Sequence, residues 1–252
     1  MADVASLFVP ERLDLVGAYN IRELGGYPTT DGSRTVTHRF LRGDELTDTT
    51  AADRAKLIEY GLHRVVDLRS SVEVRREPNP FADKPYIEYC NIPMYDGMNS
   101  ASFQGSAPDS LGEMYIAMLE GEGADLGRVM RMLAEPTTGV TLIHCTAGKD
   151  RTGVVAALVL LLAGVPDDSV VADYAATAAN MKEEFEALRF AARHARIDIP
   201  PQAFTSDPQD MRTMLSYLRE HYGTARDYLI GHCGCDPEVP TRIAERLRGE
   251  RD

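Results

Sequence analysis

Hydrophobic positions in the first half of the chain form short runs separated by turn residues, a pattern typical of strands that alternate with helices. The runs that predict strands are 39–42, 63–68, 86–92 and 139–143. A helical stretch over 50–60 follows the first run, and another over about 111–133 precedes the last. Residues 95–112 are rich in Gly, Ser, Asn and Pro and predict a long loop, which in a compact domain is usually functional or mobile.

The second half of the chain shows helical periodicity alone. Apolar residues step by three or four positions over 170–192 and again over 211–222, and residues 238–248 predict a last helix. The longest apolar run, 154–165, is shorter than the roughly 18 residues that span a bilayer, so it predicts a buried helix.

Strands that alternate with helices and are followed by helices alone predict an α/β fold. We expect a central, mostly parallel sheet flanked by helices, with a C-terminal helical extension. The expected organisation is a single domain over 1–252, with a core of about 12–165 and the extension over about 167–250.

Composition narrows the classes of partner. The 252 residues carry 39 acidic and 27 basic side chains, a net charge of −12, which argues against nucleic acid or an anionic membrane as the main partner. The N-terminus has no basic leader, and four cysteines in a chain of this length do not indicate a disulfide framework. Cytoplasmic location is the default expectation, with leaderless secretion left open, and we expect no stable membrane insertion.

The segment 144–153, with the sequence HCTAGKDRTG, joins the last predicted strand to the buried helix. This order places backbone N–H groups and a helix N-terminus around one point. Cys145 would face the positive end of the helix, which favours a thiolate. Arg151, six positions on, can fold back and present its planar fork to an anion. The segment therefore predicts a nest for a tetrahedral dianion with a thiolate beneath its central atom.

A site of this kind performs nucleophilic displacement at phosphorus. Cys145 would attack, and water would hydrolyse the phosphocysteine, with no metal and no cofactor required. The residues expected to hold the substrate phosphate are Thr146, Ala147, Gly148, Lys149, Asp150 and Arg151. The alternative is a buried structural cysteine in a turn, which the flanking strand and helix make less attractive.

The segment resembles the signature loop of the cysteine-dependent protein tyrosine phosphatase superfamily, and its Lys-Asp pair before the arginine resembles the bacterial atypical branch. Other segments that resemble this branch occur in order at 20–26, 40–46, 66–70 and 171–174. The resemblance is strongest over 139–174 and weakest over 95–135 and 195–235. It implies a phosphatase that acts on phosphotyrosine, with phosphoserine/threonine and phosphoinositides as further substrates.

The resemblance also implies roles for single residues. Cys145 would be the nucleophile and Arg151 the phosphate binder, while Asp150 inside the loop would be the general acid. In the eukaryotic-type branches the acid comes from a separate loop upstream, where Asp96 is the alternative candidate here. We favour Asp150 because it lies within the predicted phosphate-binding segment and is therefore close to the leaving oxygen. Lys149 resembles the lysine of phosphoinositide-hydrolysing members and would attract a second phosphate; a solvated turn is the other interpretation.

Alternatives to this enzyme are a module that binds phosphate or a phosphoinositide on the same fold with little turnover, and another cysteine enzyme such as a sulfurtransferase or arsenate reductase. The presence of Cys145, Asp150 and Arg151 together argues against a binding module. The expected partner is a phosphorylated protein or a phosphoinositide, and not nucleic acid. The oligomeric state is left open.

Several further residues have a structural and a functional interpretation. His144 is expected to orient the loop rather than act as a base, and Cys233 with Cys235 is too small a set for a structural zinc site. Arg22 and Arg42 would pair with Asp44 or Glu45 or contact substrate. In the resembled branch, helices after the loop form a lid, so part of 167–222 would cover the pocket. Arg189, Arg193 and Arg196 form a basic face near the expected lid. It is expected to be solvated, with contact to an anionic substrate as the alternative.

Overall fold

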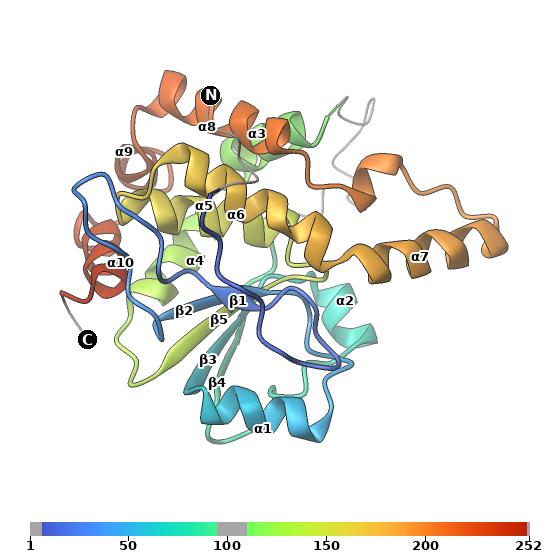
Figure 1. Ribbon diagram of the computed structural model, residues 1–252. Helices are drawn as coiled ribbons and strands as arrows, with labels where there is room; N and C mark the ends of the chain where they lie inside the picture. Colours follow the sequence, from blue (N-terminus) through green and yellow to red (C-terminus); the bar gives the residue numbers. More distant parts are fainter. Residues whose placement is uncertain (1–6, 95–109, 251–252) are drawn as a thin grey trace.

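The computed structural model describes residues 7–94 and 110–250, and in these residues a five-stranded sheet has helices on both faces (Figure 1). The strands are β1 (Arg22–Glu23), β2 (Phe40–Gly43), β3 (Leu62–Asp67), β4 (Glu88–Asn91) and β5 (Val140–His144). Their order is β1-β2-β5-β3-β4, and all neighbours are parallel except β1 and β2. The predicted α/β fold with a mostly parallel sheet is confirmed.

Helices connect the strands and form the second half of the molecule. The helices are α1 (Ala51–Glu59), α2 (Ser71–Arg76), α3 (Leu111–Gly121), α4 (Gly123–Ala134), α5 (Asp150–Leu162), α6 (Asp167–Asn180), α7 (Lys182–Ala195), α8 (Pro208–Tyr222), α9 (Ala225–Gly231) and α10 (Glu238–Arg248), with a 3₁₀ turn η2 (Pro201–Phe204). Local sequence explains several of their ends. Thr50 and Ser70 begin α1 and α2 with capping boxes, and Asp207 caps α8 before a proline.

Each face of the sheet buries its own apolar cluster. On one face, Leu57 of α1 packs with Val65 of β3 and Leu142 of β5. On the other face, Val66 and Ile143 belong to a larger cluster with α3, α4, α5 and α8. Burial on both faces explains why the last predicted strand is apolar except at Thr141 and does not alternate. The apolar run 154–165 lies in and after α5, which is buried in this cluster as expected.

Two helical stretches are divided where the sequence pattern is continuous. The stretch expected over 111–133 breaks at Glu122 between two glycines, giving α3 and α4, because glycine costs helical stability. The stripe over 170–192 breaks at Met181, which lies outside helical geometry and packs against Phe185 and Phe204. Short elements such as α2 and α9 were not predicted.

The helices of residues 167–250 do not pack together as one layer over the segment 144–153. α8 packs on α3 and α6, and α10 packs on α4 and α5, so both belong to the helical layer above the sheet. In Figure 1, α7 extends away from the body, and the chain returns from its far end through η2. In the part of the chain that the structure describes, no helix has the length and apolarity needed to cross a membrane.

Candidate active site

The loop 145–149 begins at the carboxyl end of the central strand β5. The strands β2, β5 and β3 end in register, with Gly43 opposite His144 and His144 opposite Asp67. The segments that follow these strands therefore meet at one edge, where α/β sheets bind ligands. Cys145 is the first residue of the loop, with only 3% of its surface exposed. The positive end of α5 lies directly after the loop.

The carbonyl oxygens of residues 145–148 all accept hydrogen bonds from surrounding groups. The donors are the His144 ring to Cys145 (3.0 Å), the Glu45 N–H to Thr146 (2.9 Å), the Asn20 amide to Ala147 (3.0 Å) and the Arg42 guanidinium to Gly148 (2.5 Å). In a trans peptide the C=O and the following N–H point in opposite directions. The N–H groups of 146–149 therefore face away from these donors, and among the described residues they donate to no acceptor. Four free amides beside one thiol form a cradle for an anion.

Gly148 is required by the path of the loop. Its φ is +65°, in the left-handed region, and a Cβ atom there would lie 2.3 Å from the carbonyl oxygen of Gly43. Any side chain would push the loop off the end of β2 and break the contact that Arg42 makes with the Gly148 carbonyl.

Arg151 is held in place by Glu73 of α2. Its Nη1 and Nη2 atoms each lie 2.9 Å from a Glu73 carboxylate oxygen, and the Thr146 hydroxyl donates to the same carboxylate at 2.6 Å. Burial would raise the pKa of Glu73, but the hydrogen bonds and charge of Arg151 outweigh it and hold this pKa well below its usual range. The geometry fixes the guanidinium beside the loop with its fork oriented.

Sequence reasoning missed Glu73, although a local signal was present. Ser70 and Glu73 form a capping box, in which the Ser70 N–H donates to Glu73 at 2.7 Å. The box starts α2 directly after a segment that resembles the phosphatase branch. The signal predicts the helix, but the contact with Arg151 spans 78 positions of sequence and depends on the fold.

Asp150, the first residue of α5, is half-buried and accepts a hydrogen bond from the Tyr115 hydroxyl at 2.6 Å. Tyr115 also lies 2.7 Å from the hydroxyl of Tyr174. Burial and the nearby Asp150 carboxylate raise the pKa of Tyr115 well above its ordinary value, so the hydroxyl keeps its proton and donates. The alternative acid, Asp96, lies outside the described residues.

Lys149 is buried, with 1% of its surface exposed, so the solvated-turn interpretation is wrong. Its Nζ atom donates to the carbonyl oxygens of Gln202 (3.0 Å) and Ala203 (2.9 Å) in η2. Ala147 packs against a small apolar cluster of the segment from α7 to η2, made by Met181, Phe185 and Phe204. This segment therefore rests directly on the loop, and the expected lid over part of 167–222 stays a prediction.

Arg22 and Arg42 do not pair with Asp44 or Glu45, as one interpretation had it. Both guanidinium groups bind the carboxylate of Asp173 in α6, Arg22 at 3.0 Å, and all three side chains are buried. Asp44 instead accepts the N–H groups of Tyr19 and Asn20, and Glu45 pairs with Arg69 at 2.6 Å. The network ties the N-terminal segment, β2 and α6 together behind the loop.

His144 is buried and serves the loop, as expected. Its Nδ1 lies 3.0 Å from the Cys145 carbonyl oxygen and its Nε2 lies 3.0 Å from the Asn79 amide. Because a carbonyl can only accept, Nδ1 carries the proton and Nε2 accepts from Asn79. Burial lowers the pKa of His144, which is consistent with a neutral ring.

Cys233 and Cys235 belong to the part of the chain that packs against α4. Both side chains are buried, and the Cys235 Sγ lies 3.9 Å from a nitrogen of Arg131. Within residues 7–94 and 110–250, no group of three or more His, Cys, Asp or Glu side chains is placed to hold a metal ion.

Comparisons with known proteins identify relatives of this chain. A family model described as the tyrosine phosphatase family matches residues 13–249. A tyrosine-protein phosphatase from Nostoc commune is 33% identical over 199 residues, which are 75% of this chain and 68% of that protein. The triple specificity protein phosphatase PtpB from Mycobacterium tuberculosis is 34% identical over 191 residues, which are 64% of this chain and 67% of that protein.

Two further matches cover less of the relative or share less of its sequence. A relative from Cupriavidus necator is 33% identical over 165 residues, and the match spans 59% of its length. The crystal structure of P. aeruginosa TpbA aligns with this chain at a TM-score of 0.41 and 15% sequence identity. The alignment covers 84% of this chain and 89% of TpbA.

Proposed function

The chain belongs to the tyrosine phosphatase family, and from this premise we propose that it hydrolyses phosphotyrosine through a phosphocysteine on Cys145. The observation that carries the proposal is the cradle itself: four amide groups beside a buried cysteine that donate to no acceptor in the described residues, with the Arg151 guanidinium held next to them by Glu73. A phosphoryl group has three equatorial oxygens that need donors of this kind, and charge spreads over them in the transition state.

The reaction has two steps. In the first, the Cys145 thiolate attacks phosphorus, the bond from phosphorus to the tyrosyl oxygen breaks, and Asp150 gives its proton to the departing oxygen. In the second, water attacks phosphorus and gives a proton to Asp150, the S–P bond breaks, and inorganic phosphate leaves. The amides of 146–149 and the guanidinium of Arg151 hold the phosphoryl oxygens throughout.

Asp150 is our proposed general acid, because it begins α5 one residue before Arg151 and is oriented by Tyr115. Asp96 is the competing candidate. Replacing each with Asn and comparing phenyl phosphate with nitrophenyl phosphate separates them, since nitrophenol leaves with little help from an acid. We expect Asp150→Asn to slow the phenyl ester far more than the nitrophenyl ester, and Asp96→Asn to affect both equally or neither.

Phosphoserine/threonine and phosphoinositides are proposed as additional substrates. The name of the M. tuberculosis relative gives it three specificities, and the loop carries Lys149, whose ammonium lies at the base of the segment from α7 to η2. To bind a second phosphate, the Lys149 ammonium must give up its hydrogen bonds to the η2 carbonyl oxygens and donate to phosphate oxygens instead. A panel of phosphotyrosine peptides, phosphoserine peptides and soluble phosphoinositides ranks the three classes.

The proposed activity is tested by hydrolysis of an aryl phosphate in the presence of a chelator. We expect turnover that vanadate inhibits, and loss of turnover in Cys145→Ser. Full activity of Cys145→Ser under the same conditions would exclude the mechanism.

A further inference from the structure

The segment 182–199, which we call the arm, consists of α7 and the turn that follows it. In Figure 1 the arm projects from the side of the body. Three of its large apolar side chains are exposed to solvent: Leu188 (50%), Phe190 (65%) and Ile197 (60%). Burial of such side chains is favourable, so their common exposure at the outer part of one projecting element indicates a surface that something covers.

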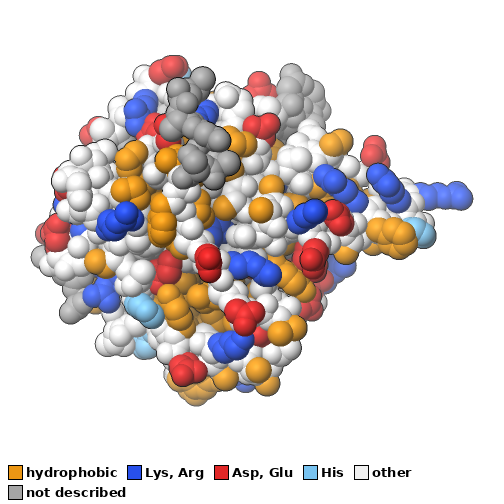
Figure 2. Space-filling model, viewed as in Figure 1, with side chains coloured by type: hydrophobic (Ala, Val, Ile, Leu, Met, Phe, Trp, Pro, Cys, Tyr) orange, Lys and Arg blue, Asp and Glu red, His pale blue; other side chains and the backbone are white. Residues whose placement is uncertain are grey.

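Charge on the arm is divided along its length. The acidic side chains Glu183, Glu184 and Glu186 lie in the first turns, near the body. The outer part, 188–199, carries Arg189, Arg193 and Arg196 with a single carboxylate, Asp198. Figure 2 shows Lys and Arg side chains beside hydrophobic ones over the projecting part. A chain with a net charge of −12 therefore has a basic, apolar outer end on this element.

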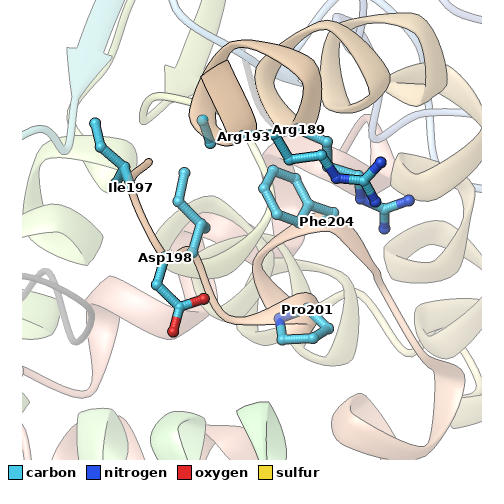
Figure 3. Close-up of a pocket in the computed structure, with 8 residues that line it drawn as sticks. Arg189, Arg193, Ile197, Asp198, Pro201 and Phe204 are labelled. Carbon is cyan, nitrogen blue, oxygen red and sulfur yellow. The ribbon is translucent and has the colours of Figure 1, made fainter. Parts of the chain in front are cut away.

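A hollow of about 300 Å³ lies between the end of α7 and η2 (Figure 3). Arg189, Arg193 and Asp198 line it together with the apolar side chains Ile197, Ile199 and Phe204. The guanidinium carbon of Arg189 lies 4.8 Å from the centre of the Phe204 ring. Guanidinium groups next to apolar walls suit a molecule with an anionic head and an apolar body.

We propose that the arm docks on an anionic lipid surface, with its exposed apolar side chains in the acyl boundary and its arginines among the headgroups. Leu188 and Phe190 are two positions apart on α7, so they point about 200° apart around the helix axis. A surface therefore contacts one of them, and Phe190 is the one that shares a side of the helix with Arg193, three positions on, so an apolar side chain and an arginine meet the lipid together. Charge complementarity with anionic headgroups accounts for the three arginines.

The acidic body does not prevent this contact. Fourteen residues make α7 about 21 Å long, which exceeds the screening length of about 8 Å at physiological ionic strength. The outer end therefore meets the lipid before the charge of the body acts strongly on it.

The test measures binding of the full chain to vesicles by sedimentation. We expect binding to phosphatidylcholine vesicles that contain phosphatidylserine and little binding to phosphatidylcholine alone. Arg193→Gln with Arg196→Gln should weaken binding by about fivefold per arginine and reduce its dependence on salt. Phe190→Ser with Ile197→Ser should weaken binding without changing that dependence.

A matched control removes an arginine and an exposed aromatic residue elsewhere: Arg128→Gln in α4 with Tyr86→Ser, both solvent-exposed. This variant should bind vesicles like the parent chain, and all variants should hydrolyse nitrophenyl phosphate in solution at the parent rate. Equal binding by the arm variants and the control would overturn the proposal. A raised KM for acidic phosphopeptides in the arginine variant, without vesicle binding by the parent, would assign the arm to a protein partner instead.

Discussion

At the scale of single residues, the site is arranged before a phosphate arrives. Glu73 fixes the Arg151 fork and receives the Thr146 hydroxyl, while Tyr115 fixes Asp150. Donors oriented in advance need no reorganisation in the transition state, which is how such groups lower a barrier. Glu73 also balances one charge of the site, so the loop amides supply a large part of the attraction for the dianion.

Replacement of Glu73 tests this arrangement. Without the carboxylate, Arg151 loses a bidentate, charge-assisted partner of the kind that is worth about 1.5–3 kcal/mol. We expect Glu73→Ala to lower kcat/KM about 10- to 100-fold through a raised KM, and Glu73→Gln, which keeps one acceptor oxygen, to lower it less. Steady-state kinetics with nitrophenyl phosphate provides the measurement. An unchanged KM in Glu73→Ala would show that Arg151 is positioned by other groups.

Tyr115 is expected to position Asp150. Loss of its hydroxyl in Tyr115→Phe should reduce kcat for phenyl phosphate by about tenfold, the size of one hydrogen bond that orients the acid. The effect on nitrophenyl phosphate should be smaller, with little change in KM. Tyr174→Phe is the matched control, because Tyr174 bonds to Tyr115 and not to Asp150. Equal losses on both esters would mean that Tyr115 acts on folding and not on proton transfer.

At the scale of elements, the sequence pattern predicts those that bury a regular apolar face. The strands β2, β3, β4 and β5 and the helices α1, α5, α8 and α10 lie within a few residues of the predicted ranges. The pattern fails where an apolar stripe continues through a break, as at Met181, because both halves bury the same kind of surface. It also fails for short elements such as α2, whose stability depends on a cap and on tertiary contacts.

The segment from α7 to η2 depends on Lys149. Its two hydrogen bonds to η2 carbonyls, with the packing of Phe185 and Phe204 on Ala147, attach the segment to the loop. Lys149→Met keeps the length of the side chain and removes both bonds. We expect faster hydrogen exchange over 199–206 and a loss of about 1–3 kcal/mol in unfolding free energy. Lys182→Met in α7 is the control. Unchanged exchange in Lys149→Met would show that packing alone holds the segment.

At the scale of the whole molecule, contacts between distant parts of the sequence complete the site. The segment 144–153 identified the nucleophile and the arginine, because their spacing and neighbours are local. Asn20, Arg42, Glu73 and Tyr115 act on the same loop from 35 to 128 positions away, and local periodicity does not record such pairs. The single-domain organisation and the cytoplasmic location stay predictions.

The buried carboxylate of Asp173 joins three parts of the fold. Asp173→Asn leaves Arg22 and Arg42 without their charged partner, which should cost about 3–5 kcal/mol in unfolding free energy at neutral pH. Urea denaturation measures it. A change below about 1 kcal/mol, the size of a surface ion pair, would contradict the role of this network.

The ion pairs of Asp173 with Arg22 and Arg42 make the stability of the protein depend on pH. Burial would raise the pKa of Asp173, but the two arginines outweigh it and lower this pKa below its ordinary value. The stabilisation by Asp173 is therefore complete above the unfolded-state pKa of about 3.9 and is lost as the pH falls below it. The difference in stability between the parent chain and Asp173→Asn should be constant from pH 6 to about 8 and should shrink in acid. A difference that grows in acid would reverse the sign of the argument.

The central claim is that the loop amides and Arg151 present a phosphoryl group to Cys145. Rapid mixing of the protein with an aryl phosphate, a denaturing quench within the first turnover and peptide mass spectrometry test it most directly. We predict one phosphoryl group on Cys145 in the parent chain and none in Cys145→Ser. Product formed by the parent chain without a phosphorylated Cys145, or with the phosphoryl group on another residue, would contradict the account.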